Sequence, residues 1–108
     1  IVCVSSGAAV LGNRGQVNYA AAKSALHGAA KSLAREMASR GVTVNVVAPG
    51  IIEGSMTHEL FTPEQIRQMI PAARTGTPQE VAAAIAFLCS DGAAYVNGQV
   101  IGVNGGMA

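Results

Sequence analysis

The sequence predicts an α/β fold in which three parallel strands are flanked by helices, and two observations carry this prediction. Three short runs rich in β-branched and apolar residues lie at Ile1–Val4, Val42–Ala48 and Gln99–Val103. Continuous runs of this kind are typical of parallel strands that are buried on both faces. Segments long enough for helices separate the runs, as right-handed crossover connections require. The order indicates part of a doubly wound domain.

The first connection is predicted to contain a loop and one long helix. The strand ends at Ser5–Gly7, and glycine and asparagine turn signals place a loop from Ala8 to Gly15. The helix is expected from Gln16 to Arg40, rich in alanine and with an apolar stripe formed by Leu26, Leu33 and Met37. Gly41 follows directly and is the expected left-handed stop.

Shorter elements are predicted after the second strand, which Pro49-Gly50 breaks. Residues 51–74 are expected to hold two short helices, one at Met56–Phe61 and one capped by Thr62, and to serve as a lid or substrate loop. A capping box then starts a further helix at Thr77, Pro78 and Glu80. Its buried face is marked by Val81, Ile85 and Leu88.

Composition and charge exclude several classes of function. The chain has 108 residues, is 50% hydrophobic and carries a formal net charge of +1. One domain is therefore expected, and neither nucleic acid nor a membrane surface is favoured as a partner. No apolar run reaches the roughly 18 residues that span a bilayer. Cys3 and Cys89 belong to no metal-binding or CxxC pattern, so we expect reduced thiols in a cytoplasmic protein and no metal.

A phenol and an ammonium stand four residues apart in the run Tyr19-Ala20-Ala21-Ala22-Lys23. Residues i and i+4 share one face of a helix, so the two groups should lie together. The positive charge favours a phenolate, which lets a tyrosine exchange protons near neutral pH. Ser6 ends the preceding strand, and open α/β sheets bind ligands at the carboxyl ends of their strands. One crevice could therefore hold all three groups.

Four features, in this order and spacing, resemble the classical short-chain dehydrogenase/reductases. They are Ser6, the Tyr19–Lys23 motif after twelve intervening residues, Asn45–Gly50 and Val103–Gly106. The resemblance runs over essentially the whole chain, and within the family it is greatest toward bacterial 3-oxoacyl-[acyl-carrier-protein] reductases. It implies that Tyr19 donates a proton to a ketone oxygen, that Lys23 eases ionisation of Tyr19 and holds the nicotinamide ribose, and that Ser6 holds the substrate carbonyl.

The same resemblance implies a nicotinamide cofactor, with NADP(H) favoured over NAD(H). The cofactor wall would be formed by Pro49, Gly50 and Ile52, together with Tyr19 and Lys23. Family members often carry a threonine where this chain has Gly54, and Ser55 is the candidate substitute.

The family's glycine-rich phosphate-binding turn and the asparagine of its usual catalytic set have no counterpart in these residues. Residues 1–108 are therefore expected to be the C-terminal catalytic part of a single Rossmann-like domain, without its dinucleotide-binding half. The opening run Ile1–Val4, which has no initiator methionine, fits that expectation. The segment alone is expected to be inactive and poorly stable.

The implied partners are an acyl thioester, on an acyl carrier protein, and further copies of the chain in a dimer or tetramer. Candidate carrier contacts are Lys31, Arg35 and Arg40, for which a solvated helix face is the alternative. His27 is expected to be structural, and His58 to be a solvent-exposed or packing residue of the lid, or a substrate contact.

Other functions also stay open. The chain could belong to a reductase or dehydrogenase of another small ketone or secondary alcohol, or to a non-catalytic oligomerisation module of the same fold. Taken alone, Tyr19 and Lys23 would also fit an ordinary surface pair.

Overall fold

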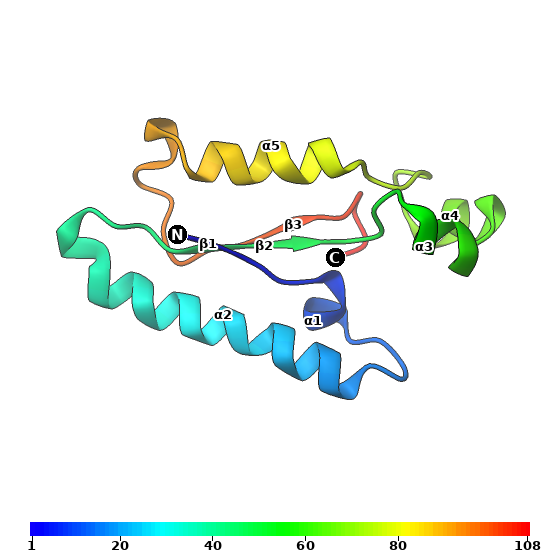
Figure 1. Cartoon of the computed structure of the whole chain (residues 1–108), viewed down its shortest axis with the longest axis horizontal. Coiled ribbons are helices and arrows are strands. Elements are labelled where there is room, and N and C mark those ends of the chain that lie inside the picture. The colour runs from blue at the N-terminus through cyan, green and yellow to red at the C-terminus, as the bar shows by residue number, and fades with distance from the viewer.

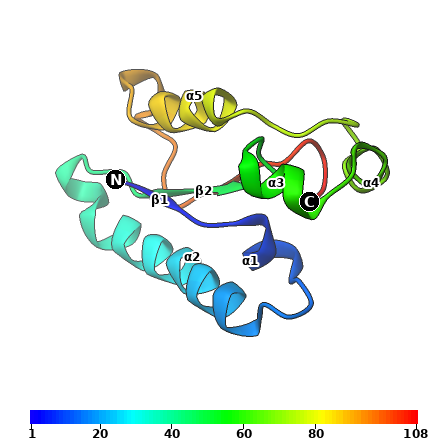
Figure 2. The same cartoon turned by 45° about the vertical axis from the view of Figure 1, so that its right-hand side comes forward.

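The computed structural model describes all 108 residues and shows a parallel sheet between two layers of helices (Figure 1). The long helix α2 (Val17–Met37) and the short helix α1 (Gly7–Leu11) lie on one side of the sheet, and α5 (Pro78–Leu88) lies on the other. Helices α3 (Ser55–Leu60) and α4 (Pro63–Met69) lie beyond the carboxyl ends of the strands (Figure 2). None of the helices is both long and apolar enough to cross a bilayer.

The sheet has the order β1 (Val2–Val4), β2 (Asn45–Pro49), β3 (Val100–Val103), and both pairings are parallel. Val47 in the centre pairs with Val4 on one side and with Ile101 on the other. The predicted fold class, three parallel strands with flanking helices, is therefore confirmed. The second strand begins three residues later than predicted, at Asn45, because the amide of Val44 bonds the side chain of Asn97 and not a neighbouring strand.

The core between α2 and the sheet is built from small side chains. Ala30 and Ala34 of α2 are buried against Val44 and Val46. Alanine at these positions lets the helix backbone approach the sheet closely, so the longer side chains lie to the sides of the contact. The predicted apolar stripe of Leu26, Leu33 and Met37 is accordingly only half-buried.

Local chemistry sets the helix ends as predicted. Thr62 and Thr77 each form a capping box, with Gln65 and Glu80 respectively, at the starts of α4 and α5. The long helix ends in a single 3₁₀ turn, Ala38–Arg40, and Gly41 follows with φ 73°. This left-handed conformation is the one that glycine adopts without strain.

The loop predicted from Ala8 to Gly15 is wrong in its first half, where the structure has helix α1. Ser6 is extended, and its Oγ accepts a hydrogen bond from the Ala8 amide at 3.2 Å, as an N-cap residue does. The turn begins only at Gly12, whose φ is 75°. The turn signals therefore apply from Gly12 onward, and the serine at the strand end starts the helix.

A buried amide fixes the turn that leads into β3. Asn45 has no exposed surface, and its Nδ2 donates to the carbonyl oxygen of Val96 at 2.9 Å. Its Oδ1 accepts from the amide of Gln99 at 3.0 Å. One side chain therefore satisfies two backbone groups and aligns β3 with β2. A second 3₁₀ turn, Asp91–Ala93, precedes this region.

Candidate active site

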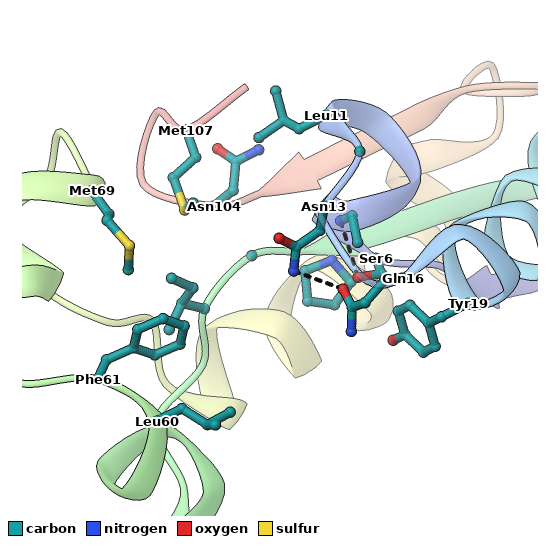
Figure 3. Close-up of a pocket in the computed structure, with 16 residues that line it drawn as sticks. Ser6, Leu11, Asn13, Gln16, Tyr19, Leu60, Phe61, Met69, Asn104 and Met107 are labelled. Atoms are coloured by element: carbon teal, nitrogen blue, oxygen red, sulfur yellow. Dashed lines mark hydrogen bonds between the residues drawn. The ribbon is translucent and has the colours of Figure 1, made fainter.

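A cavity of about 370 Å³ opens at the carboxyl ends of the strands, where the fold class predicts a ligand site. Its sixteen lining residues come from α1, the start of α2, the end of β2, the C-terminal segment and the predicted lid, which is the segment of helices α3 and α4 (Figure 3). Four of the six predicted site residues are among them: Ser6, Tyr19, Pro49 and Gly50. The other two, Lys23 and Ile52, do not line it.

Ser6, Gln16 and Tyr19 form a polar wall of this cavity (Figure 3). The Ser6 Oγ accepts the hydrogen bond from the Ala8 amide, so its hydroxyl hydrogen remains available to a ligand. Tyr19 stands in the first turn of α2 and is 42% exposed, so its hydroxyl is accessible. Asn13 donates to Gln16 Oε1 at 2.8 Å, which ties the loop before α2 to the same wall.

Lys23 lies one turn beyond Tyr19 on α2, as the spacing requires, but no hydrogen bond joins the two side chains. The Lys23 ammonium donates to the carbonyl oxygen of Val4 at 3.2 Å, at the end of β1. An ammonium has three donors, and this bond uses one of them. The positive charge of Lys23 therefore lies at the carboxyl end of β1, beside the first turns of α2 that carry Tyr19.

Ile52 follows the end of β2 and does not itself line the cavity, although its neighbour Ile51 does. Ile52 forms an isolated parallel bridge with Gly76, in which the amide of Glu53 donates to the Gly76 carbonyl at 2.7 Å. A Cβ at Gly76 would lie 2.9 Å from Ile52 Cδ1, so the two residues are closely packed. This bridge attaches the segment after the lid to the wall that Pro49 and Gly50 begin.

An apolar wall faces the polar one across the cavity (Figure 3). It consists of lid and C-terminal side chains, Leu60, Phe61, Met69 and Met107, while Leu11 of α1 adds an apolar side chain on the side of Ser6. The lid is joined to the C-terminal segment where the amide of Ala72 donates to the Gly105 carbonyl at 3.0 Å. A cavity with one polar and one apolar wall suits a ligand that carries a carbonyl or hydroxyl group on an apolar chain.

Asn104 is a lining residue that sequence reasoning did not assign to the site. It follows β3 directly, and its Oδ1 accepts from the amide of Gly106 at 3.0 Å. The signal was present in Val103–Gly106, a polar residue and two glycines at a strand's carboxyl end, but this run served only to support the family resemblance. The apolar wall was also missed, because its members are far apart in the sequence.

The strongest electrostatic interaction lies outside the cavity. Arg74, at the end of the lid segment, forms a two-point ion pair with Glu80 of α5, at 2.6 Å and 2.9 Å. The Arg74 hydrogen bond, helped by the Thr77 amide, lowers the pKa of Glu80 to about 2. The pair fixes the lid's exit to the start of α5.

The remaining polar residues singled out in the sequence have mostly structural surroundings. His27 bonds the buried hydroxyl of Ser5, which accords with the structural role expected for it. His58 is exposed on α3 and does not line the cavity. Lys31 donates to the Gly98 carbonyl at 2.8 Å, while Arg35 and Arg40 are exposed.

A family model described as "Enoyl-(Acyl carrier protein) reductase" matches residues 1–108. The chain belongs to the short-chain dehydrogenase/reductase family. It is 55% identical over 109 residues to the 3-oxoacyl-[acyl-carrier-protein] reductase FabG of Escherichia coli (strain K12) and 54% identical over 109 residues to that of Salmonella typhimurium. Nodulation protein G of Rhizobium meliloti is 54% identical over 110 residues.

A solved structure has the same fold throughout. The crystal structure of a short-chain dehydrogenase/reductase from Brucella melitensis, named SDR:Glucose/ribitol dehydrogenase, superposes with a TM-score of 0.92 at 42% identity. The alignment covers 100% of this chain and 44% of that one. The FabG relatives are likewise covered over 45% of their length, so the chain spans somewhat less than half of the proteins it matches.

Proposed function

We propose that residues 1–108 carry the substrate and nicotinamide side of the active site of an NADP(H)-dependent 3-oxoacyl-[acyl-carrier-protein] reductase. The observation that carries this proposal is the meeting of Ser6 and Tyr19 in one cavity at the carboxyl ends of parallel strands, opposite an apolar wall. The 54–55% identity to two FabG reductases supports the same reaction. The dinucleotide-binding half would lie outside these residues.

In this proposal Tyr19 and Ser6 act on the same ketone oxygen. Tyr19 donates the proton, and Ser6 donates a hydrogen bond that holds the oxygen in place. The Ser6 cap on α1 supports this role, because an Oγ that accepts from the Ala8 amide has its own hydrogen free and is fixed in direction. General acid catalysis by such a positioned side chain typically contributes about 10²–10⁴-fold to the rate.

Lys23 would stabilise the tyrosinate that remains after proton transfer. Its ammonium is held at the end of β1 by one hydrogen bond to Val4, which leaves two donors for a ribose hydroxyl or for Tyr19. The attraction between opposite charges about 4 Å apart near a protein surface is up to roughly 4 kcal/mol, before screening by solvent. A lysine in this position would therefore favour transfer of the Tyr19 proton to the ketone oxygen.

The residues present fit a flat cofactor ring at the end of β2. Gly7 and Gly50 line this end of the cavity and add no side chain to it. A Cβ at Gly50 would lie 2.8 Å from Asn104 Cβ, and one at Gly7 would lie 3.4 Å from the Pro49 carbonyl oxygen, so both glycines are closely packed. Bound there, the cofactor would supply the hydride. Pro49, Gly50 and the backbone at Ile52 would hold the nicotinamide, with Ser55 near the start of α3 as the candidate side-chain contact.

The apolar wall supports an acyl thioester as the substrate, since Phe61, Met69 and Met107 would cover an aliphatic chain. An acidic carrier protein would meet the basic side chains of α2 and its end, of which Arg35 and Arg40 are exposed and Lys31 is engaged with Gly98. The alanine-rich outer face of α2 would pack against a second copy in a dimer or tetramer.

A dehydrogenase of a secondary alcohol is the second candidate, because the solved structure with a TM-score of 0.92 is named as a glucose/ribitol dehydrogenase. The two candidates differ in what the apolar wall must accept. A polyol would leave Leu60, Phe61 and Met69 against hydroxyl groups. Comparing the rates with a 3-oxoacyl thioester and with ribitol separates them.

The test is a Tyr19→Phe substitution in the protein expressed from its complete gene. We expect NADPH oxidation with a 3-oxoacyl thioester to fall about 10²–10⁴-fold, because the proton donor is lost, with NADPH binding nearly unchanged. Tyr95→Phe is the matched control, since the chain's other tyrosine is fully exposed. A Tyr19→Phe variant as active as Tyr95→Phe would contradict the proposed function.

A further inference from the structure

Ser5, the neighbour of Ser6, joins the end of β1 to helix α2. It is only 4% exposed, and its amide donates to the Val47 carbonyl at 2.8 Å, so its backbone belongs to the sheet. Its hydroxyl points the other way. The Ser5 Oγ donates to the carbonyl oxygen of Lys23 at 3.2 Å and lies 2.7 Å from Nε2 of His27.

The two hydrogen bonds of Ser5 are compatible only when His27 carries a proton on Nε2. A serine hydroxyl has one hydrogen, and donation to the Lys23 carbonyl uses it. The Ser5 Oγ must then accept from His27. The imidazole thus acts as a donor that completes the bonding of a buried hydroxyl, and no buried side-chain polar atom is left without a partner.

These bonds act at one turn of α2, the turn that follows Tyr19. Lys23 makes two hydrogen bonds there. Its ammonium donates to the Val4 carbonyl, and its own carbonyl accepts from the Ser5 hydroxyl. Ser24 adds a bond from its hydroxyl to the Ala9 carbonyl at 3.0 Å, which ties α1 to the same turn. These hydrogen bonds therefore fix the position of α2, and with it Tyr19, relative to Ser6.

Helix α1 packs against the first half of α2, but the fully buried residues of α2 lie far from Tyr19. These residues, Ala30 and Ala34, are eleven and fifteen positions beyond Tyr19, which is roughly 16 to 23 Å along a helix. They are also small and offer little resistance to sliding or rotation of the helix. Near Tyr19 the directional restraints are the hydrogen bonds of the Lys23–His27 turn.

We propose that Ser5 and His27 form a positioning pair that holds Tyr19 and Lys23 in register with Ser6. The proposal rests on the proposed function, because it gives the pair an effect on catalysis. Neither Ser5 nor His27 lines the cavity, so the pair acts through the position of α2 and not by contact with the substrate. A misplacement of about 1 Å in a reacting geometry can cost on the order of 10²-fold in rate.

The experiment compares four variants of the protein expressed from its complete gene: Ser5→Ala, His27→Leu, His27→Gln and Ser32→Ala. Ser5→Ala and His27→Leu remove the pair, and we expect kcat to fall about tenfold or more while KM for the 3-oxoacyl thioester changes little. His27→Gln keeps an N–H donor and should restore most of kcat. Ser32→Ala is the control, since this serine is exposed on the same helix.

Equal kcat values for Ser5→Ala and Ser32→Ala, or for His27→Leu and His27→Gln, would overturn the positioning role. A lower melting temperature with an unchanged kcat per folded site would show a merely structural pair. If Ser5→Ala fails to fold, the two His27 variants decide the question. A wild-type protein that does not reduce the thioester would instead overturn the proposed function, and the two failures are thereby distinguished.

Discussion

At the scale of single residues, Gly50 marks the point where β2 ends and the cavity begins. Its amide donates to the Val103 carbonyl at 2.9 Å, which holds it beside the end of β3. A Cβ there would lie 2.8 Å from Asn104 Cβ and 2.9 Å from Asn104 Cα. Both atoms lie at or next to the backbone of Asn104, so they cannot move aside as the far end of a flexible side chain could.

Gly50→Ala is therefore expected to destabilise the fold by about 1–3 kcal/mol, as overpacking does. Gly28→Ala is the matched control, because Gly28 lies exposed in α2 with no atom within 4 Å of an added Cβ. Gly28→Ala should raise the free energy of unfolding by up to about 1 kcal/mol, because alanine is more favourable than glycine in a helix interior. Chemical denaturation of the protein from its complete gene measures the free energy of unfolding of both variants. Equal free energies for Gly50→Ala and Gly28→Ala would refute the steric argument.

Sequence spacing favours Ser6 over its neighbour Ser5 as the site residue, and the structure shows that each serine has its own surroundings. Successive residues at a strand point to opposite sides, so Ser5 turns into α2 while Ser6 lines the cavity. The hydrogen bonds of Ser5 could not be predicted. They depend on how far along the sheet α2 lies, and a residue pattern does not contain that distance.

At the scale of elements, the helix starts were the most predictable features. The capping boxes at Thr62 and Thr77 arise from residues three apart, so a short window of sequence contains all of their chemistry. Helix α1 was missed because it has five residues and its cap, Ser6, also reads as a strand end. The lid was predicted as two short helices. Its apolar wall was not predicted, because Met69 and Met107 are far apart in the sequence and meet only at the cavity.

The start of α5 should make stability depend on pH at the acid end. Glu80 has a pKa of about 2 in the fold against an ordinary value of 4.5. The ionised Glu80 therefore contributes its full share to the stability of the fold above about pH 4.5. This contribution is lost as the pH falls from about 4.5 toward 2. We expect the melting temperature of the wild type to fall over this range toward that of Glu80→Gln.

The control for that titration is Glu36→Gln, an exposed glutamate of α2 for which the structure has no ion pair. Its melting temperature should follow that of the wild type between about pH 5 and pH 2. If Glu80→Gln also paralleled the wild type over this range, the ion pair with Arg74 would contribute nothing to the fold.

At the scale of the whole molecule, the β-branched runs predicted the topology, because a parallel sheet needs little more than buried strands and long crossovers. The core that residues 1–108 bury by themselves is small. Of the 108 residues 11 are buried, and large apolar side chains such as Leu60 and Phe87 are exposed. β1 lies at the edge of the sheet with Ile1 and Val4 59% and 44% exposed.

Residues 1–108 expressed alone are therefore expected to unfold in a broad transition at low temperature, or to aggregate. Circular dichroism during heating, with analytical ultracentrifugation, measures both properties. The protein from its complete gene, treated in the same way, is the control and should melt cooperatively. A sharp melt of the 108-residue segment as a monomer would contradict this prediction.

The central place of β2 has a consequence for biosynthesis. β2 pairs with β1 and with β3, and β3 is translated last of the three strands. After Pro49 leaves the ribosome, the chain must grow by about 50 residues before Val100 follows. At 5–20 residues per second this is about 3 to 10 s, during which one side of Val46 and Val47 has no partner. A codon-usage change that slows translation of residues 50–99 would lengthen this vulnerable interval and increase the demand for chaperones.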